Sequence, residues 1–318
     1  MTARRQPGDL VDAARSGDRS ALARLLSLVE RGGAEAHQVG RRTFPLSGSA
    51  YTVGVTGSPG AGKSTLTSAL VAHARSSSGA RLAVLAIDPS SPYTGGAILG
   101  DRVRMDRHAL DDGVFIRSMA TRGHLGGLTL ATPEAIRVLD AAGYPWVIVE
   151  TVGVGQVEVA VASAADTTVV VVNPGWGDSV QANKAGLMEI ADVFVVNKAD
   201  RDGAAETIGD LESMLDLTGD SDWRPPVVRA VSTTGDGAAE LWQAIDDHRR
   251  HLEASGQLSA RRHERLRHEL DHIVEQRLRA KAQALLAATG RSTLDADLAT
   301  GRLDPWSAAD LLLTPLEA

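Results

Sequence analysis

A glycine-rich stretch in the first quarter of the chain has the residue types and spacing of a phosphate-binding loop. Residues 57–65 read GSPGAGKST, which fits the pattern G-x-x-x-x-G-K-[ST]. Glycines let the backbone curl so that consecutive N–H groups point at phosphate oxygens, and a helix beginning near Lys63 adds the positive end of its dipole. Lys63 would reach the β- and γ-phosphates, and the Ser64 hydroxyl would bind Mg²⁺. The stretch therefore predicts binding of a nucleoside triphosphate through Gly57, Ser58, Pro59, Gly60, Ala61, Gly62, Lys63, Ser64 and Thr65.

A second motif indicates which base the nucleotide carries. Residues 197–200 read NKAD, a guanine-recognition pattern, directly after an expected strand. Guanine presents N1–H and an exocyclic amine side by side, and the Asp200 carboxylate can accept both hydrogen bonds, whereas adenine would leave this carboxylate unpaired. The Lys198 stem can lie over the base, Asn197 would brace the loops, and Ser232 in the loop after the last expected strand would lie nearest the guanine O6. The base-binding residues expected from these loops are Asn197, Lys198, Asp200, Ser232, Thr233 and Thr234.

Oxygen-bearing side chains near the phosphate loop are candidates for a Mg²⁺ site. Glu150 ends an expected strand, where an acid helps to hold the Mg²⁺ shell, and the N–H of Gly153 can donate to the γ-phosphate. Glu stands where most GTPases have Asp, and its extra methylene suggests contact through water. Asp88 ends a strand and Asp101 lies in a glycine-rich stretch that could close on γ-phosphate and Mg²⁺, although either could be a loop or cap carboxylate. The candidate metal residues are Ser64, Asp88, Asp101 and Glu150, and the candidate catalytic residues are Lys63, Asp101, Glu150 and Gly153.

Three further positions bear on the rate of hydrolysis and on signalling. Val154 stands where small GTPases of the Ras type hold the glutamine that positions the attacking water, so the isolated protein should hydrolyse GTP slowly, with a partner or a rearrangement supplying the missing group. Gln156 is a candidate for that group only if its segment moves. Lys184 lies in a stretch that contains glycines and a Trp before a helix, and it either contacts the nucleotide or Glu150 or is simply exposed. Gln156 and Lys184 are the candidate switch residues.

The elements that must position these residues alternate between strand and helix. Near-continuous β-branched strands between helices predict an α/β fold of the P-loop NTPase type, with a mostly parallel sheet covered on both faces. The expected strands are 51–56, 81–88, 114–118, 145–150, 167–173, 192–197 and 226–231, and the expected helices are 64–73, 133–142 (with a proline in its first turn), 157–165, 179–191, 203–217 and one from about 237.

Helical segments extend this core at both ends. Residues 1–48 are expected to form an N-terminal helical segment, and 49–256 the GTPase domain. The helical pattern of the first segment covers residues 9–32, is broken at 16–18 and is expected to end at Gly32-Gly33. Residues 257–318 are all helical, with an apolar stripe and an arginine-rich opposite face that is either solvated or packed on a second subunit. His268 and His272 lie four residues apart there and form a possible metal pair that lacks a third ligand nearby.

Composition limits the function classes. The 318 residues carry a net charge of −7, which argues against general binding to nucleic acid or anionic membranes. No apolar run reaches about 18 residues and the N-terminus lacks an apolar signal core, so neither a membrane span nor a secretory leader is expected. The chain has no cysteine, which fits a cytoplasmic protein and excludes disulfides and thiolate metal sites.

With these residues placed, the sequence resembles the MeaB/ArgK family of SIMIBI-class P-loop GTPases, which are associated with methylmalonyl-CoA mutase. The resemblance covers nearly the whole chain and is carried by GSPGAGKST (57–65), IDPSSP (87–92), GGAILGDRVRM (95–105), FIRSMATRGHLGG (115–127), ETVGVGQ (150–156), NKAD (197–200), ALARLLSLVE (21–30) and DPWSAADLLL (304–313). It implies a GTP-hydrolysing chaperone that gates adenosylcobalamin delivery to an acyl-CoA mutase and protects that enzyme. It also implies Mg²⁺ at Ser64, Asp88, Asp101 and Glu150, a homodimer through the C-terminal helices, and a switch element around Lys184.

Three alternatives remain at this point. A metallochaperone GTPase for nickel shares the same core, but it needs His tracts or Cys motifs, whereas Cys is absent here and the nine His are scattered. A kinase acting on a transport-system protein is a role under which ArgK-type sequences have been labelled, although no general base beside an acceptor site is visible and NKAD selects GTP. A non-catalytic GTP-binding scaffold would show no turnover.

Overall fold

The computed structural model describes residues 6–88, 108, 110–120, 125–151, 157–176, 181–217, 222–288 and 291–317. The chain divides into two compact units, Met1–His263 and Glu264–Ala318. The first unit contains a seven-stranded sheet in which every pair of neighbouring strands is parallel, in the order β3-β2-β4-β1-β5-β6-β7. The strands are β1 (Tyr51–Gly57), β2 (Leu82–Asp88), β3 (Val114–Ala120), β4 (Trp146–Thr151), β5 (Thr167–Val172), β6 (Val193–Asn197) and β7 (Val227–Ala230). The predicted α/β fold is confirmed, and the strand bounds agree with those expected to within about two residues at most ends.

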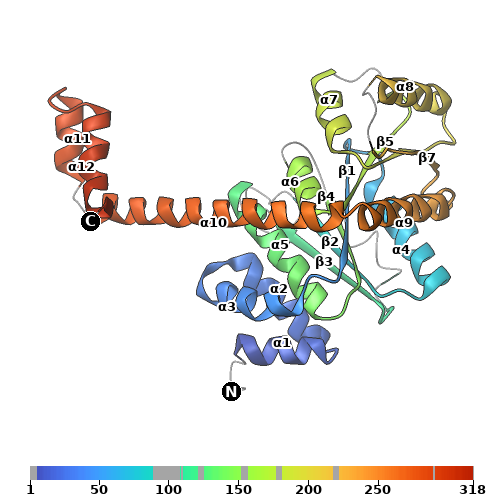
Figure 1. Ribbon diagram of the computed structural model, residues 1–318, viewed down its shortest axis with the longest axis horizontal. Helices are drawn as coiled ribbons and strands as arrows, with labels where there is room; N and C mark the ends of the chain where they lie inside the picture. Colours follow the sequence, from blue (N-terminus) through green and yellow to red (C-terminus); the bar gives the residue numbers. More distant parts are fainter. Residues whose placement is uncertain are drawn as a thin grey trace. The chain divides into compact units, whose positions relative to one another are not determined.

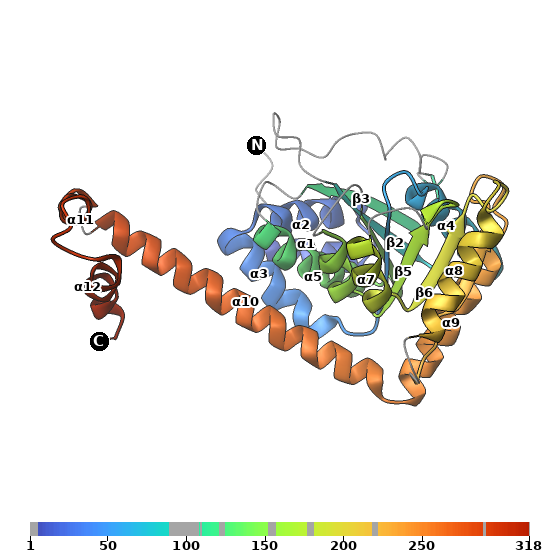
Figure 2. The same cartoon turned by 90° about the horizontal axis from the view of Figure 1, so that it is seen from above.

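Helices cover both faces of this sheet (Figures 1 and 2). They are α4 (Lys63–Ser78), α5 (Leu125–Ala141), α6 (Val157–Ala164), α7 (Gln181–Ile190), α8 (Ala204–Asp216) and α9 (Ala238–Ala254). Side chains alternate along a strand, so one face of β1 and β4 packs with α4 and α9 through Val53, Val55 and Ile148. The opposite face of β4 packs with α5 through Val147 and Val149. Because all strands run in one direction, the loops that follow β1, β4 and β6 meet at the same edge.

The N-terminal helices belong to the same packed core as the sheet. They are α1 (Pro7–Arg15), α2 (Arg19–Arg31), α3 (Gly33–Thr43) and the short 3₁₀ helix η1 (Phe44–Leu46). Figure 1 shows α2 and α3 beside α5, and Leu25, Leu26 and Val39 share one buried cluster with Leu139 of α5. An ion pair at 3.0 Å between Arg117 of β3 and Glu30 of α2 also joins the N-terminal helices to the sheet.

Two sequence expectations about helices were wrong. Gly32 ends α2 with a positive φ of 71°, but the helical region does not stop there, because α3 begins at the next residue. Its buried positions Ala36 and Val39 pack on the neighbouring helices, and this burial outweighs the two glycines. The helix expected from residue 133 begins at Leu125 instead, so Pro133 lies inside α5 rather than in its first turn. A proline removes one hydrogen bond, and Ala135, Val138 and Leu139, all buried, hold the helix in place.

The second unit is helical. The long helix α10 (Gln257–Ala288) begins in the first unit and continues into the second, which also contains α11 (Arg291–Ala299) and α12 (Pro305–Glu317). On α10, Leu266, Leu270, Val274 and Leu278 are 41%, 59%, 46% and 54% exposed, so this part of the expected apolar stripe is uncovered in the single chain. None of the helices formed by described residues has the length and apolarity needed to cross a membrane.

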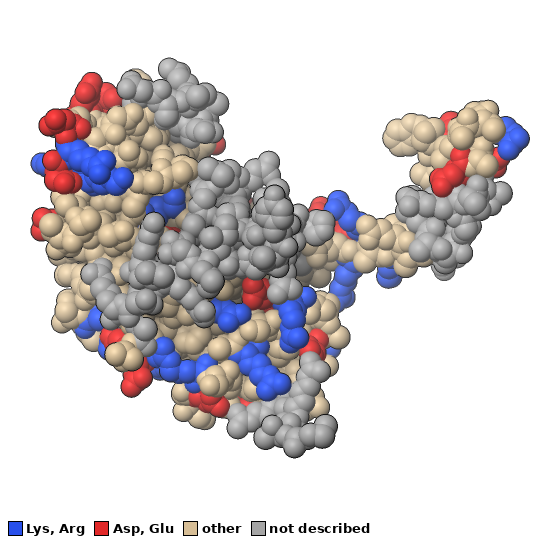
Figure 3. All heavy atoms as spheres, turned by 180° about the vertical axis from the view of Figure 1, so that it is seen from behind, with Lys and Arg blue, Asp and Glu red and all other residues tan. Residues whose placement is uncertain are grey.

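Charges of both signs occur on the surface. On the face shown in Figure 3, the visible basic and acidic residues are interspersed, which agrees with the mixed composition of the chain. His268 and His272 each lie near an acid of their own helix, Glu264 at 3.8 Å and Glu275 at 4.0 Å. Among the described residues, no three His, Cys, Asp or Glu side chains gather into a metal site.

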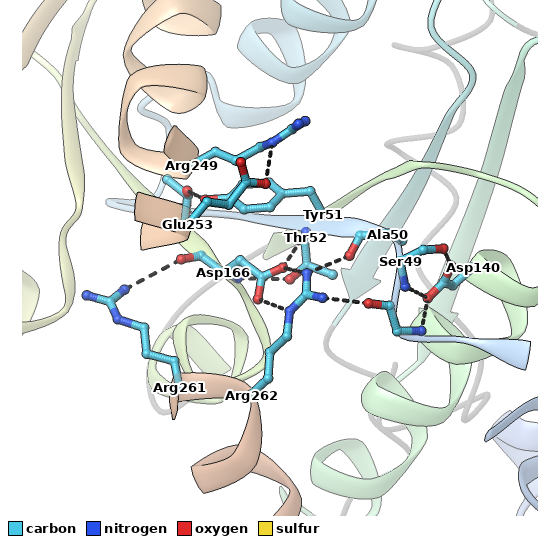
Figure 4. A network of polar contacts seen from close by, with 12 residues as sticks. Ser49, Ala50, Tyr51, Thr52, Asp140, Asp166, Arg249, Glu253, Arg261 and Arg262 are labelled. Carbon is cyan, nitrogen blue, oxygen red and sulfur yellow. Dashed lines mark hydrogen bonds and ion pairs between the residues drawn. The ribbon is translucent and has the colours of Figure 1, made fainter. Parts of the chain in front are cut away.

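Two adjacent arginines attach the first turns of α10 to the amino-terminal edge of the sheet (Figure 4). Arg262 binds both carboxylate oxygens of Asp166, at 3.1 and 2.7 Å, and also donates to the carbonyls of Gly48 and Ala50. Asp166 is only 1% exposed. Arg261 binds Asp192 at 3.1 Å. Each aspartate follows an alanine and directly precedes a strand, so the tandem arginines match a repeated Ala-Asp pair below β5 and β6.

A buried hydrogen-bonded chain continues this network. The Tyr51 hydroxyl lies 2.6 Å from Thr167 Oγ1, which lies 2.8 Å from His248 Nδ1. The other ring nitrogen of His248 faces Asp192 Oδ1 at 3.3 Å. Burial lowers the pKa of His248 from its ordinary 6.5 to about 4, against the opposing effect of Asp192, and burial also raises the pKa of Tyr51. Both side chains are therefore uncharged at neutral pH, which lets Tyr51 donate to Thr167 and Thr167 donate to His248.

Candidate nucleotide-binding site

The phosphate loop follows the central strand and depends on glycine at its first position. Gly57 has a φ of +128°, and a Cβ there would lie 2.0 Å from the carbonyl oxygen of Val171 on the neighbouring strand β5. Only glycine allows this close approach. Gly60 and Gly62 also have positive φ values, 73° and 91°, which curl the loop before α4 begins at Lys63. The geometry agrees with a loop whose backbone N–H groups surround a phosphate.

Lys63 is held inside this loop. Its side chain is buried, with 7% of the residue exposed, and Nζ donates to the carbonyl oxygens of Gly57 at 2.7 Å and Ser58 at 3.1 Å. The ammonium is thus fixed at the first turn of α4, where a triphosphate would bring its negative charges. A lysine held by its own loop needs little reorganisation to meet an anion.

Ser64 and Glu150 meet at the start of α4. The Ser64 hydroxyl donates to Oε1 of Glu150 in a short hydrogen bond, and the two residues are 5% and 0% exposed. Parallel pairing of β1 with β4 places Val55 opposite Glu150, which brings the acid to the phosphate loop. A hydroxyl beside a carboxylate is the kind of hard oxygen set that Mg²⁺ prefers, so these two residues fit the ion.

The guanine-recognition motif is bound to the phosphate loop by hydrogen bonds. Asn197, only 2% exposed, donates from Nδ2 to the carbonyl of Ala61 at 2.7 Å. Lys198 has a positive φ of 57°, rare outside glycine, and its Nζ donates to the carbonyl of Gly60 at 2.7 Å. Asp200 is exposed, so its carboxylate is accessible to a base. The phosphate loop and the NKAD loop are therefore joined by direct hydrogen bonds.

The loop after β7 is joined to the same asparagine. Ser232 donates to Asn197 Oδ1 from both its backbone nitrogen, at 3.1 Å, and its hydroxyl, at 2.6 Å. Both donors of Ser232 are thus directed at Asn197 in the structure. Thr233 and Thr234 are exposed, and Thr234 Oγ1 donates to the carbonyl of Val231 at 3.0 Å. The structure brings this loop to the NKAD motif, as the order of motifs in the sequence suggested.

Several predicted site residues lie outside the part of the chain that the structure describes. This holds for Asp101, Gly153, Val154 and Gln156. Asp88 is the last residue of β2 and Lys184 belongs to α7, but their side chains are outside the described part. The places of Asp88 and Asp101 at the metal, and the switch roles of Gln156 and Lys184, stay predictions.

Sequence reasoning missed residues whose partners are distant in the chain. The two threonines Thr56 and Thr151, one residue before the phosphate loop and one after Glu150, share a hydrogen bond. Polar residues at the ends of otherwise aliphatic strands were the available signal. The arginine pair 261–262 was noticed only as part of a charged helix face, because its partners lie as much as 214 residues away in the chain.

Comparison with known proteins gives consistent results. Residues 22–287 match the family described as methylmalonyl Co-A mutase-associated GTPase MeaB. A putative GTPase of Pyrococcus abyssi is 51% identical over 309 residues, 96% of this chain and 95% of its own. GTPase ArgK of Escherichia coli is 42% identical over 253 residues, covering 77% and 76% of the two chains. The mitochondrial methylmalonic aciduria type A homolog of Mus musculus is 36% identical over 269 residues, 83% of this chain and 65% of its own.

Among solved structures, the fold is similar to a crystal structure of an LAO/AO transport system kinase. The TM-score is 0.71 with 29% sequence identity, and the match covers 98% of each chain. Both terminal helical regions are therefore included in the match.

Proposed function

We propose that this chain, which belongs to the family of methylmalonyl Co-A mutase-associated GTPases, MeaB, serves as a G-protein chaperone of an adenosylcobalamin-dependent acyl-CoA mutase. The chain is a GTPase, as its family and its relatives are described. Methylmalonyl-CoA mutase is the first candidate, and GTP hydrolysis would gate cofactor loading and protect the mutase. The family description and the mouse relative support this partner. The observation that carries the nucleotide assignment is the direct bonding of Asn197 and Lys198 to the carbonyls of Ala61 and Gly60.

The described residues divide the work of binding and hydrolysis. Backbone N–H groups of the phosphate loop and the Lys63 ammonium would hold the β- and γ-phosphates, and Asp200 would select guanine. Ser64 and Glu150 would hold Mg²⁺, together with Asp88 and Asp101. The ion supplies charge neutralisation at the phosphates when it is bound. Asp101 and Gly153 complete the proposed catalytic set.

Slow turnover by the isolated chain is part of the proposal. Val154 cannot orient a water molecule, so a partner or a movement that includes Gln156 would complete the site. Lys184 on α7 would report the nucleotide state to the mutase. A slow enzyme whose rate depends on a partner acts as a switch rather than as a bulk hydrolase.

We further propose that the protein is a cytoplasmic homodimer through its C-terminal helices, without nucleic-acid or membrane partners. The uncovered stripe Leu266, Leu270, Val274 and Leu278 supports this assignment, because apolar side chains at helical spacing are stabilised by burial against another surface. Sedimentation of the wild type and of a Leu270→Glu, Leu278→Glu variant would test it, with a monomeric variant expected.

The test of the chaperone proposal combines a pull-down with a GTPase assay. The full chain is incubated with apo-mutase and holo-mutase, with GTP or GDP, and phosphate release is followed. We expect a complex that depends on the nucleotide and a rate that rises on binding. Absence of a complex and of any rate change with all cobalamin mutases tested would refute the proposal.

The same assay, run with γ-labelled GTP, separates the alternatives. Label on a transport-system protein would favour the kinase role after which the protein in the similar crystal structure is named. Label released as free phosphate is the expected result. An Asp200→Asn variant, which should lose GTP affinity, controls for contaminating hydrolases.

A further inference from the structure

Two buried threonines join the strands that carry the phosphate loop and Glu150. Thr56 is the last residue of β1 before Gly57, and Thr151 is the last residue of β4, directly after Glu150. Thr151 Oγ1 donates to Thr56 Oγ1 at 3.3 Å. Thr151 is 1% exposed and Thr56 is 0% exposed, so water does not replace this bond. The hydroxyls therefore meet at the point where two functional loops begin.

The pair lies on the face of the sheet opposite to Ser64. Side chains alternate along β4, so Glu150 points toward α4 with Ile148, whereas Thr151 points to the other face with Val149. Glu150 is bonded to Ser64 on the α4 face, and Thr151 is bonded to Thr56 on the opposite face. The carboxyl end of β4 is thus attached to the phosphate-loop region from both sides.

Packing alone does not account for threonine at these positions. Buried valines lie close to both positions along the chain, Val55 in β1 and Val149 in β4. Valine has nearly the same shape as threonine and would fill these sites without a buried polar group. A buried hydroxyl is costly unless it is hydrogen-bonded. The hydrogen bond between the two threonines, rather than their packing, therefore accounts for the residue type at both positions.

We propose that Thr56 and Thr151 are positioning residues for GTP hydrolysis. Their hydrogen bond holds the end of β4 against the end of β1, which keeps Glu150 in place beside Ser64 and the phosphate loop. This inference rests on the proposed role of Glu150 at Mg²⁺. The pair acts through Glu150 and touches neither the nucleotide nor the metal.

The test uses valine variants of the full chain: Thr56→Val, Thr151→Val and the double variant. Either single variant leaves one buried hydroxyl without its partner, and we expect kcat to fall roughly 2-fold, the effect of one hydrogen bond at the weak end of the range, because 3.3 Å is long for a bond between two hydroxyls. GDP affinity should stay unchanged, and the Mg²⁺ concentration for half-maximal rate should rise. Thr151→Ser keeps the hydroxyl and should retain kcat.

The double variant separates positioning from stability. Two valines remove both buried hydroxyls, so the free energy of unfolding should return close to the wild-type value. The positioning role predicts that kcat nevertheless stays low. A double variant that recovers kcat together with stability would overturn the proposal, and so would wild-type kcat in Thr151→Val.

Thr167→Val is the matched control. It removes a buried hydroxyl that lies between Tyr51 and His248 at the opposite end of the sheet, so it breaks two hydrogen bonds and tests a loss of stability at least as large. Thr167→Val should lower the free energy of unfolding while leaving kcat unchanged. If its kcat falls as much as that of the Thr56 and Thr151 variants, the fall reflects lost stability in general, and a specific role for the pair is refuted.

A Glu150→Gln variant is assayed in parallel. If it leaves the Mg²⁺ requirement unchanged, the metal role proposed for Glu150 fails, whatever the threonine variants show. The kcat of the valine variants decides the threonine pair by itself.

Discussion

Replacing Arg262 with glutamine should strongly destabilise the protein, because it leaves a buried carboxylate without its cation. Asp166 is 1% exposed and accepts hydrogen bonds from Arg262 at 3.1 and 2.7 Å and from the Thr52 nitrogen at 3.0 Å. Arg262→Gln removes both arginine bonds to this carboxylate and retains the bond from the Thr52 nitrogen. Breaking a buried ion pair on one side costs about 3–5 kcal/mol. The Arg262 side chain is 26% exposed, so we expect the lower end, about 3 kcal/mol.

The neighbouring Arg261 provides a matched control on the same helix. Its side chain is 39% exposed and its partner Asp192 is 13% exposed. Water can reach this pair, and Asp192 keeps its bond from the Thr168 nitrogen, so Arg261→Gln should cost at most about 1 kcal/mol. Both substitutions remove the same charge and a similar volume. The difference between them therefore reports the burial of the aspartate together with the two carbonyl bonds of Arg262 to Gly48 and Ala50, and the double variant described next separates the charge from those bonds.

Urea denaturation followed by circular dichroism gives the free energy of unfolding of each variant. An Asp166→Asn, Arg262→Gln double variant should be more stable than Arg262→Gln alone, because the buried charge is then absent. Equal small losses for the two arginine variants would refute the reasoning, since they would show that Asp166 is not held as a buried charge. A double variant no better than the single one would refute it as well.

Three further predictions concern acid stability, the phosphate loop and base selection. Burial lowers the pKa of His248 to about 4, so the unfolded chain binds more protons than the folded chain between pH 6.5 and 4. The free energy of unfolding therefore decreases by up to about 3 kcal/mol as the pH is lowered through this window. Urea titrations at several pH values should show a smaller decrease in His248→Gln, and an equal decrease would contradict this. Gly57→Ala places a Cβ 2.0 Å from the Val171 carbonyl oxygen and should cost more than about 2 kcal/mol and abolish GTP binding, as measured by thermal unfolding and nucleotide titration. Asp200→Asn should weaken GTP binding by roughly 10–100-fold and favour a xanthine nucleotide, whose C2 carbonyl accepts a hydrogen bond from the asparagine amide. If GTP and xanthosine triphosphate compete for the variant as they do for the wild type, the assignment of Asp200 to base selection is refuted.

The local parts of the fold were readable from the sequence because their causes are local. The phosphate loop needs glycine and lysine at fixed spacing, and the buried strands are continuous β-branched runs. The start of α3 was missed because Gly32-Gly33 looks like a helix end, whereas the burial of Val39, which depends on tertiary contacts, extends the helical region. The start of α5 was missed for the same reason.

The bonds between the site's loops were only partly predictable. The order of motifs indicated that NKAD and the phosphate loop would meet, but not that Asn197 would take both donors of Ser232. The Thr56–Thr151 pair depends on the register of β1 against β4, which the sequence alone does not give. Strand order, rather than any motif, decides which side chains become neighbours.

The two ends of the sheet use polar side chains for different purposes. At the amino-terminal edge, both carboxylate oxygens of Asp166 bind Arg262. These charges stabilise the fold and attach α10 to the sheet. At the carboxyl-terminal edge, Lys63 and Lys198 donate instead to carbonyl oxygens of the phosphate loop, bonds between a full charge and a neutral acceptor. An ammonium gains more from a phosphate anion than from a neutral carbonyl oxygen, so a triphosphate would strengthen the interactions of Lys63 in its proposed role.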